Sequence, residues 1–541
     1  MKRLAMVVAL AACAQVASGQ EPASGTAPSF SPVTWERLLD AAEEPHNWLM
    51  YSGTFSSQRF SRLDQINAGN VGDLKLKWAY QIPVIDRAET TPLVVDGVMF
   101  VTEAPSNLTA IDAATGGVYW RYEHELPDDL RICCGRNNRG VAVLGNTLFM
   151  STLDAHLVAI DARSGNLLWN TEVAEYSQGY SKTAAPLIVK DKVVTGIAGG
   201  EFGIRGFLDS YNAESGAREW RTYTIPGPDH PDNRSWSGES WRTGGSPTWI
   251  TGSYDPELDL VYWGTGNPGP DYNGEMRLGD NLYSDSVLAL DGDTGEMSWY
   301  FQFTPHDVHD WDAIQIPILA DIEFDGQPRK AMLWANRNAF FYVLDRATGE
   351  FLLGEPYARQ TWAERIDDQG RPVRLPDTFP TEDGTVVSPS VLGGTNWWSP
   401  AFSPRTGLFY VNAFDGEADY FVREDDYEAG FRFIGGGQQQ VEAIDNYVNA
   451  IRAIDPATAE RRWEFRITPQ SRAGVLATAG DVVFSGGIDG YFFALDAETG
   501  EELWHMQLGR LVQAAPITYA VNGEQQVTVA AGNVVYTFGL D

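Results

Sequence analysis

One phrase, apolar-x-Asp-x-x-Thr/Ser-Gly-x-x-x-Trp, recurs along the chain and restricts its fold more than any other feature of the sequence. Short runs of β-forming residues flank a turn in which Asp can bond its own backbone and Gly supplies the positive φ that ends a hairpin. Each copy is therefore predicted to form a strand, a turn and a second strand. Seven copies, two of them degraded, occupy residues 110–122, 159–171, 210–222, 289–301, 343–355, 453–465 and 494–506.

Trp78 matches the tryptophan half of an eighth copy, whose first half is either lost or supplied by the C-terminal strand. The shorter intervals between tryptophans match the roughly 40–45 residues of a four-stranded propeller blade. Because a blade cannot bury its own sheet faces, such units stack around an axis. We therefore predict an all-β, eight-bladed β-propeller over residues 20–541, with tryptophans between neighbouring blades. The long interruptions at 226–248, 357–398 and 415–448 are expected to cover one face.

The first 19 residues resemble a secretory signal peptide, with Lys2 and Arg3 followed by an apolar run and small residues. An alternative lies inside the same stretch, because Leu10 to Cys13 also resembles a lipobox whose cysteine would be lipidated and anchored. Either interpretation predicts export, and we expect a periplasmic protein. No later run approaches the roughly 18 apolar residues that a membrane-spanning helix needs.

The charge balance excludes some partners and favours others. The chain has 39 Lys and Arg against 73 Asp and Glu, a formal net charge of −34. Nucleic acid and anionic membranes would repel such a body, whereas a basic partner protein would be attracted. No Cys-x-x-Cys-His occurs, which predicts that the chain holds no covalent haem.

Cys133 and Cys134 are adjacent in a chain that is predicted to be exported, where disulfides persist. Their Cα atoms would lie about 3.8 Å apart across a trans peptide, below the usual disulfide range of roughly 4.4–6.8 Å. Bridging them would strain the backbone and close almost no loop, which favours a functional role over a structural one. The alternative is a pair of unbridged thiols.

With the repeat, six further segments carry a resemblance to the PQQ-dependent alcohol dehydrogenases of the methanol/ethanol dehydrogenase family, PQQ being pyrroloquinoline quinone. These segments are AETTPLVVDG (88–97), CCGRNNRG (133–140), GGEFGIRGF (199–207), YWGTGNPGP (262–270), TPHDVHDWD (304–312) and NRNAFFYVLDR (336–346). The resemblance runs from about Trp48 to the C-terminus.

The resemblance implies oxidation of primary alcohols to aldehydes, with electrons passed to a separate c-type cytochrome, and relatives are often homodimers. Two alternatives stay open. One is the same chemistry on a sugar, an aldehyde or a polymeric alcohol. The other is a non-catalytic propeller scaffold in envelope assembly, since an outer-membrane assembly lipoprotein uses the same repeat phrase.

The resemblance also implies a cofactor site. A disulfide between Cys133 and Cys134 would form one wall of the slot, and Trp249 would stack on the opposite face of the planar quinone, where an indole offers a large flat area. Cations and amide donors around the rim would hold the carboxylates and quinone oxygens of PQQ. The remaining implied contacts are Glu89, Arg139, Thr183, Gly199, Gly200, Arg337 and Asn396.

Glu201, Asn267 and Asp310 match the metal and catalytic set of the family. Their oxygen donors suit a hard cation, and Asp310 is the candidate base for the alcohol proton. Asp312 changes the expected metal, because an acid at this position resembles the lanthanide-dependent members of the family. If Asp312 ligates, three formal negative charges match a trivalent ion, so we predict a lanthanide, with Ca²⁺ as the alternative. The competing interpretation of Asp312 is a solvated loop acid.

Four further features bear on the site. His306 and His309 are expected to be structural or to support the ligands, since imidazole fits poorly among oxygen donors. Pro247 and Arg472 depart from the family pattern, where relatives have a polar contact and an aromatic residue, and these departures argue against methanol as substrate. The Gly-rich run at 433–440 lacks the Lys and following helix of a phosphate loop.

Overall fold

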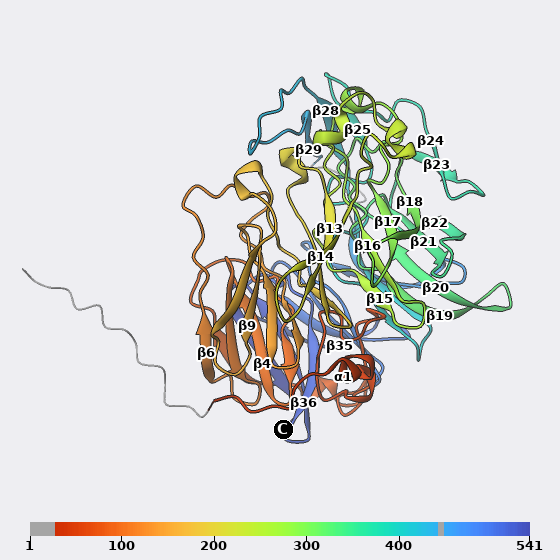
Figure 1. The fold of residues 1–541 in the computed structure, drawn as a ribbon. Helices are drawn as coiled ribbons and strands as arrows, with labels where there is room; N and C mark the ends of the chain where they lie inside the picture. The colour runs from red at the N-terminus through yellow and green to blue at the C-terminus, as the bar shows by residue number, and fades with distance from the viewer. Residues whose placement is uncertain (1–26, 442–447) are drawn as a thin grey trace, which may run out of the picture.

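The predicted eight-bladed propeller is confirmed. The computed structural model describes residues 27–441 and 448–541, so the predicted signal peptide and Cys13 lie outside the described residues. Seven four-stranded sheets and one sheet extended to five strands form the blades, and Figure 1 shows them below a cap of shorter strands and loops. The described residues contain one short α-helix, α1 (Trp35–Leu39). None of their helices is both long and apolar enough to cross a membrane.

Blades 1 to 4 follow the chain, four strands each. Their strands are β3 (Leu93–Val95), β4 (Val98–Glu103), β5 (Asn107–Asp112), β6 (Val118–Tyr122), β7 (Val141–Leu144), β8 (Thr147–Ser151), β9 (His156–Asp161), β10 (Leu167–Glu172), β11 (Leu187–Val189), β12 (Lys192–Gly196), β13 (Phe207–Asn212), β14 (Arg218–Tyr223), β15 (Ser253–Asp255), β16 (Leu260–Gly264), β17 (Ser286–Asp291) and β18 (Met297–Gln302).

Blades 5 to 7 continue the same order. Their strands are β19 (Ile318–Phe324), β20 (Gln327–Ala335), β21 (Phe340–Asp345), β22 (Phe351–Pro356), β26 (Ala401–Ser403), β27 (Leu408–Asp415), β30 (Val448–Ile454), β31 (Arg461–Ile467), β32 (Leu476–Thr478), β33 (Val482–Gly486), β34 (Tyr491–Asp496) and β35 (Glu502–Gln507). The short β1 (Phe60–Ser61) pairs in parallel with β32.

The eighth blade closes the ring with strands from both ends of the chain. It consists of β36 (Ile517–Val521), β37 (Glu524–Ala531), β38 (Val534–Gly539) and the N-terminal β2 (Lys75–Gln81). β2 is antiparallel to β38, with Trp78 opposite Thr537. The missing half of the eighth repeat is therefore supplied by the C-terminal strands, which was one of the two expectations for Trp78.

Six of the repeat tryptophans pack against the turn of the next blade. The Trp78 indole N–H donates to the Ala113 carbonyl at 3.0 Å, and a Cβ placed on Gly116 would meet the same indole at 2.8 Å. The pair formed by Trp120 and Gly165 repeats both contacts. Glycine is required here twice, for its positive φ and for the close approach of the ring. The predicted position of the tryptophans between blades is confirmed.

The substitutions in the two degraded repeats compensate for each other. Blade 5 has Leu353 where other blades have Trp, and the turn of blade 6 has Ala459 where other turns have Gly. Both side chains pack against the same hydrophobic cluster. Without an indole above the turn, a methyl group fits, although Ala459 still adopts a φ of 57°.

The three long interruptions form the cap. The first holds two 3₁₀ helices, η5 (Pro231–Ser235) and η6 (Ser240–Thr243). The other two interruptions share one sheet, in which β25 (Thr385–Val387) pairs with β28 (Ala418–Val422), and β28 pairs with β29 (Gly436–Gln440). β23 (Ala363–Ile366) and β24 (Pro372–Arg374) form a separate hairpin. Figure 1 shows these strands together at one end of the propeller.

Candidate active site

Every blade of the propeller places a residue at the same end of the propeller axis. In each blade the loop before the first strand delivers a side chain to one cavity of about 230 Å³. Because the blades are equivalent, eight loops converge on the axis. The residues are Glu89 before β3, Arg139 before β7, Thr183 before β11, Trp249 before β15, Asp312 before β19, Asn396 before β26, Arg472 before β32 and Gln513 before β36.

A second set reaches the cavity from loops between the second and third strands, which open at the same end. Glu201 lies in η4 (Gly200–Phe202), between β12 and β13, and Arg337 lies between β20 and β21. Of the residues predicted from the sequence, only Gly200 and Asn267 do not line the cavity. The residues that do are Glu89, Cys133, Cys134, Arg139, Thr183, Gly199, Glu201, Trp249, Asp310, Asp312, Arg337 and Asn396.

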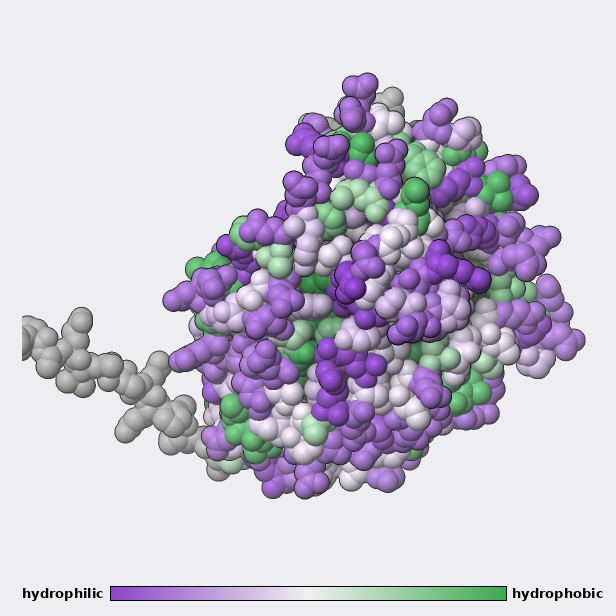
Figure 2. All heavy atoms as spheres, turned by 45° about the horizontal axis from the view of Figure 1, so that its top comes forward, coloured by the Kyte–Doolittle hydropathy of each residue, from purple (hydrophilic) through white to green (hydrophobic). Residues whose placement is uncertain are grey.

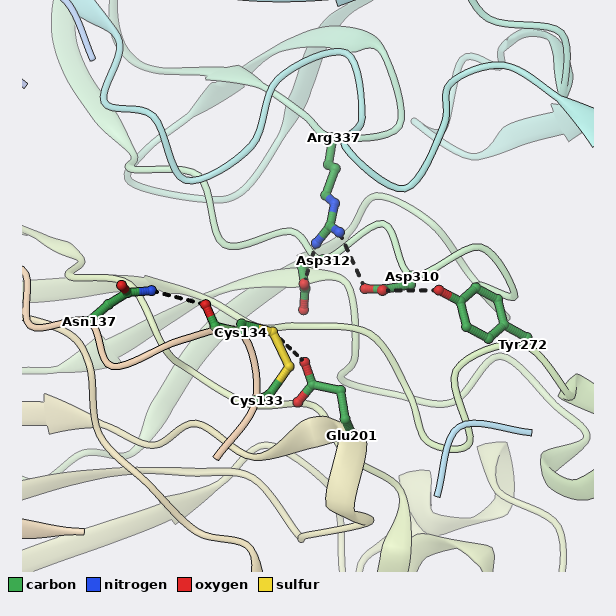
Figure 3. The surroundings of a disulfide bond; sticks show 8 residues. All are labelled: Cys133, Cys134, Asn137, Glu201, Tyr272, Asp310, Asp312 and Arg337. Atoms are coloured by element: carbon green, nitrogen blue, oxygen red, sulfur yellow. Dashed lines mark hydrogen bonds and ion pairs between the residues drawn. A yellow bond between two sulfur atoms is a disulfide. The ribbon is translucent and has the colours of Figure 1, made fainter. Parts of the chain in front are cut away.

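The structure has a disulfide between Cys133 and Cys134, in the segment that joins blade 1 to blade 2. The Asn137 side chain donates to the Cys134 carbonyl at 3.2 Å and holds this turn. Cys134 has a φ of 67°, in the left-handed region that L-residues with side chains rarely adopt. Figure 3 shows the disulfide directly beside the Glu201 carboxylate, whose Oε1 lies 3.6 Å from the Cys134 sulfur.

Arg139 is buried between aromatic rings and an acid. Its guanidinium carbon lies 5.1 Å from the centre of the Trp249 ring and 4.9 Å from that of Trp397. Nη2 pairs with the Glu89 carboxylate at 2.7 Å. Burial raises the pKa of Glu89, while Arg139, Arg87 and Arg472 oppose the rise. This end of the cavity is therefore cationic and has flat aromatic faces.

The other end of the cavity is acidic, and Arg337 compensates two of its carboxylates (Figure 3). Arg337 Nη1 pairs with Asp312, and Nη2 lies 3.4 Å from Asp310 Oδ1. The Tyr272 hydroxyl lies 3.4 Å from Asp310 Oδ2. Burial raises the pKa of Asp310 well above its ordinary value; Arg337 opposes the rise, and Asp312 and Glu201 add to it. Burial likewise raises the pKa of Glu201.

Asp312 is buried rather than solvated, with 4% of its surface exposed. Its Oδ1 accepts the backbone N–H of Asn267 at 3.0 Å. A Cβ on Gly266 would lie 2.1 Å from the same oxygen, so only glycine permits this approach. Asn267 thus lies directly behind the cavity wall, in contact with Asp312. The Pro247 ring fills the neighbouring space and would meet a Cβ on Gly200 at 3.0 Å.

Sequence reasoning missed part of this site. Asp271 was not predicted, yet Asp310 and Glu201 both raise the pKa of this buried carboxylate, after burial itself. Arg87 and Gln513 line the cavity as well, and Arg472, noted only as a departure, lies there too. The position before the first strand of each repeat was the signal that could have identified Gln513 and Arg472.

The two histidines lie outside the cavity wall. His309 donates from Nε2 to the Thr378 carbonyl at 2.8 Å and stacks on Trp311 at 4.2 Å. Burial lowers the pKa of His309 to about 3 and that of His306 to about 4, so both are neutral near pH 7. Their packing is consistent with the structural role expected from the sequence.

Two observations test whether PQQ and a cation fit this site. Several buried polar atoms have no hydrogen-bond partner in the described part of the chain, among them Arg139 Nε and Nη1, Gln513 Oε1 and Asp271 Oδ1. Buried polar atoms are normally paired, so these atoms call for a polar ligand. The mutually repelling carboxylates outnumber Arg337, and their donors are oxygens, which fits a hard cation. The residues present fit both groups.

The fold and the site define the class of protein: a β-propeller with a disulfide between adjacent cysteines in the wall of a cavity on its axis. Comparisons with known proteins show the family. Residues 48–355 match the family model described as glucose/ethanol/alcohol dehydrogenase, beta-propeller domain. The chain belongs to the PQQ-dependent quinoprotein alcohol dehydrogenases. It is 37% identical to quinoprotein alcohol dehydrogenase PedH of Pseudomonas putida over 526 residues, covering 92% of this chain and 88% of the relative.

Solved structures agree over nearly the whole chain. Quinohemoprotein alcohol dehydrogenase ADHIIG of Pseudomonas putida superposes with a TM-score of 0.90 at 35% identity, covering 95% of this chain and 83% of its own. A europium-containing methanol dehydrogenase gives a TM-score of 0.89 at 33% identity, covering 93% and 100%. Residues 449–540 also match the model of outer membrane protein assembly factor BamB. The solved BamB of Moraxella catarrhalis, 14% identical with a TM-score of 0.51, shows likeness of fold alone.

Proposed function

We propose that this PQQ-dependent alcohol dehydrogenase oxidises primary alcohols to aldehydes in the periplasm, with Asp310 as the base, a lanthanide as the metal and a c-type cytochrome as the electron acceptor. The observation that carries the proposal is the position of Asp310. Its carboxylate lines the cavity beside Asp312 and Glu201, and Arg337 and Tyr272 hold it at 3.4 Å on either oxygen.

When bound, PQQ would supply a quinone able to accept hydride from the alcohol carbon, and a cation held by Glu201, Asn267, Asp310 and Asp312 would polarise that quinone. Asp310 accepts the hydroxyl proton at a carboxylate oxygen. Arg337 is fixed by the Val391 carbonyl, to which Nε donates at 2.8 Å, so its guanidinium keeps the Asp310 carboxylate oriented.

The same cavity accounts for cofactor binding. Trp249 and the disulfide would enclose the flat faces of PQQ, with Arg139, Thr183 and Asn396 at its carboxylates and Glu89 fixing Arg139. Gly199, with a φ of 119°, keeps the wall free of a side chain there, since a Cβ would meet the Gly179 carbonyl oxygen at 2.2 Å. Gly200 would support the wall from behind.

The choice of a lanthanide rests on Asp312. It is a buried acid beside Glu201 and Asp310, and it gives the proposed ligand set three formal negative charges, with Asn267 as a neutral donor. A trivalent ion balances that charge better than Ca²⁺ does. Asp271, which sequence reasoning missed, would add to the negative field around the ion.

The metal assignment is tested by loading the protein with PQQ and either La³⁺ or Ca²⁺, and then measuring dye reduction with ethanol. We expect higher activity with La³⁺, and Asp312→Ala should lower the La³⁺ activity at least tenfold while affecting the Ca²⁺ activity less. Equal or greater wild-type activity with Ca²⁺ would contradict the lanthanide proposal. Sedimentation of the loaded protein tests the expected homodimer.

A further inference from the structure

A second hollow lies on the capped end of the molecule. We call it the cap groove: it has a volume of about 780 Å³ and lies where four segments meet. The segments are η7 (Gly274–Arg277) with its flanking residues, the loop that holds His306 and Val308, the stretch before β25, and the end of β28 with the residues that follow it. Its exposed apolar residues are Met276, Leu278 and Phe379, and its acidic residues are Glu275, Glu382, Glu424, Asp425 and Asp426.

Three apolar side chains of the cap groove are open to solvent. Leu278 exposes 59% of its surface, Phe379 43% and Met276 40%. Figure 2, in which the capped end comes forward, shows apolar residues as small separate patches in a mostly hydrophilic face. Exposed apolar residues rimmed by charge mark interaction sites more often than solitary ones do.

The charge of the cap groove is predominantly negative. Arg423 is the one basic side chain in its lining that faces solvent, against five acids. Arg277 is buried, and its guanidinium is bonded inward, to the carbonyls of Pro270, Asp271 and Asp307 and to Asn281. His306 is neutral, because burial lowers its pKa to about 4. The groove therefore suits a basic partner with an apolar contact surface.

The cap groove adjoins the cofactor cavity at Tyr272. Tyr272 lines the groove, and its hydroxyl lies 3.4 Å from Asp310 Oδ2, while Asp310 lines the cofactor cavity. A partner seated in the groove would be separated from that cavity by this tyrosine and Asp310. A second copy of this chain is a poor occupant, because its net charge of −34 would repel the acidic rim.

We infer that the cap groove is the docking surface for a basic, haem-containing electron acceptor, an inference that rests on the proposed function. Oxidation of one alcohol to an aldehyde releases two electrons and two protons. A haem protein takes one electron each time ferric iron becomes ferrous, so two docking events complete one turnover. The acidic rim steers the basic partner, and Met276, Leu278 and Phe379 supply the apolar contact.

The test uses the holoenzyme with mitochondrial cytochrome c as a basic one-electron acceptor. A groove variant combines Glu275→Gln, Glu382→Gln, Glu424→Gln and Asp426→Asn. A matched control with the same charge change combines Glu214→Gln, Glu323→Gln, Glu498→Gln and Glu501→Gln, whose side chains are exposed outside the groove. At low ionic strength we expect the groove variant to reduce ferricytochrome c at least about tenfold more slowly, and the control at most about twofold more slowly.

Reduction of a small dye reports the alcohol chemistry separately and should be unchanged in both variants. Zero-length carbodiimide cross-linking of wild-type protein to cytochrome c should map to the groove acids. Equal losses in the two variants, cross-links elsewhere, or no binding of cytochrome c by a protein that reduces the dye would overturn the docking surface. Loss of dye reduction in the wild type would instead contradict the proposed function.

Discussion

The chemical properties of single residues in this molecule depend on where the repeat places them. Asp310 lies in a loop that ends at β19, with a φ of 61° that few non-glycine residues adopt. Backbone strain of this kind tends to be found at functional sites, where the surrounding structure holds it in place. Burial and the neighbouring carboxylates raise the pKa of Asp310, and the Arg337 guanidinium opposes the rise.

Lys182 illustrates a buried charge next to the site. It adjoins Thr183, and its Nζ donates to Thr195 Oγ1 and the Gly196 carbonyl, both at 2.8 Å. Burial lowers the pKa of Lys182 to about 7. Between pH 7 and about 10 the unfolded chain would bind a proton that the folded protein does not, so this residue makes stability rise with pH in that window.

Lys182→Met should remove that rise. We expect the difference in unfolding free energy between wild type and variant to change by about 1.4 kcal/mol per pH unit between pH 7.5 and 9.5, measured by urea denaturation. Lys77→Met, at an exposed position of β2, is the control and should show no such slope. If the unfolding free energy of Lys182→Met changed with pH in the same way as that of the wild type, Lys182 would have to stay protonated in the folded protein.

At the scale of elements, the strands and turns could be predicted well from the sequence, because Asp, Gly and Trp recur at fixed spacing. The cap could not be predicted in detail, since β25, β28 and β29 pair across two interruptions that share no repeat. The same limit hid Asp271, which lies in an irregular segment between β16 and β17. Local pattern determines a blade, whereas long-range pairing determines the cap.

The close contacts between turn glycines and tryptophans predict what a side chain at such a glycine would cost in stability. A Cβ on Gly295 would meet Trp220 at 2.5 Å, so Gly295→Ala should destabilise the protein by roughly 1–3 kcal/mol in chemical denaturation.

The two degraded repeats predict a coupled pair of substitutions. Leu353→Trp should be destabilising beside Ala459, and adding Ala459→Gly should largely restore the stability. Chemical denaturation of the single and double variants measures the coupling. Additive effects would show that Leu353 and Ala459 do not share a contact.

At the scale of the whole molecule, the ring is closed by β2 and β38, two strands from opposite ends of the chain. Closure makes the eight first-strand loops converge, so the cavity exists only in the complete ring. The sequence indicated eight blades, and the loop positions that meet at the axis follow from that symmetry. The pairings between side chains on these loops, such as Arg337 with Asp312, cannot be predicted from the symmetry, because they join different loops of blade 5.

The net charge also acts at this scale. Because opposite charges steer association and salt screens them, reduction of a basic cytochrome should slow as ionic strength rises, whereas reduction of an uncharged dye should not. Stopped-flow rates between about 10 and 300 mM salt measure this difference. A cytochrome rate that is independent of salt would argue against electrostatic docking.

The most direct test of the account compares wild type with Asp310→Asn and with Asp383→Asn, an exposed acid of the cap. Each protein is loaded with PQQ and La³⁺, cofactor binding is followed by its absorbance, and ethanol-dependent dye reduction is measured. We predict that all three bind PQQ, that wild type and Asp383→Asn turn over alike, and that Asp310→Asn loses at least about a hundredfold in rate. Cofactor binding with full activity in Asp310→Asn would contradict the account.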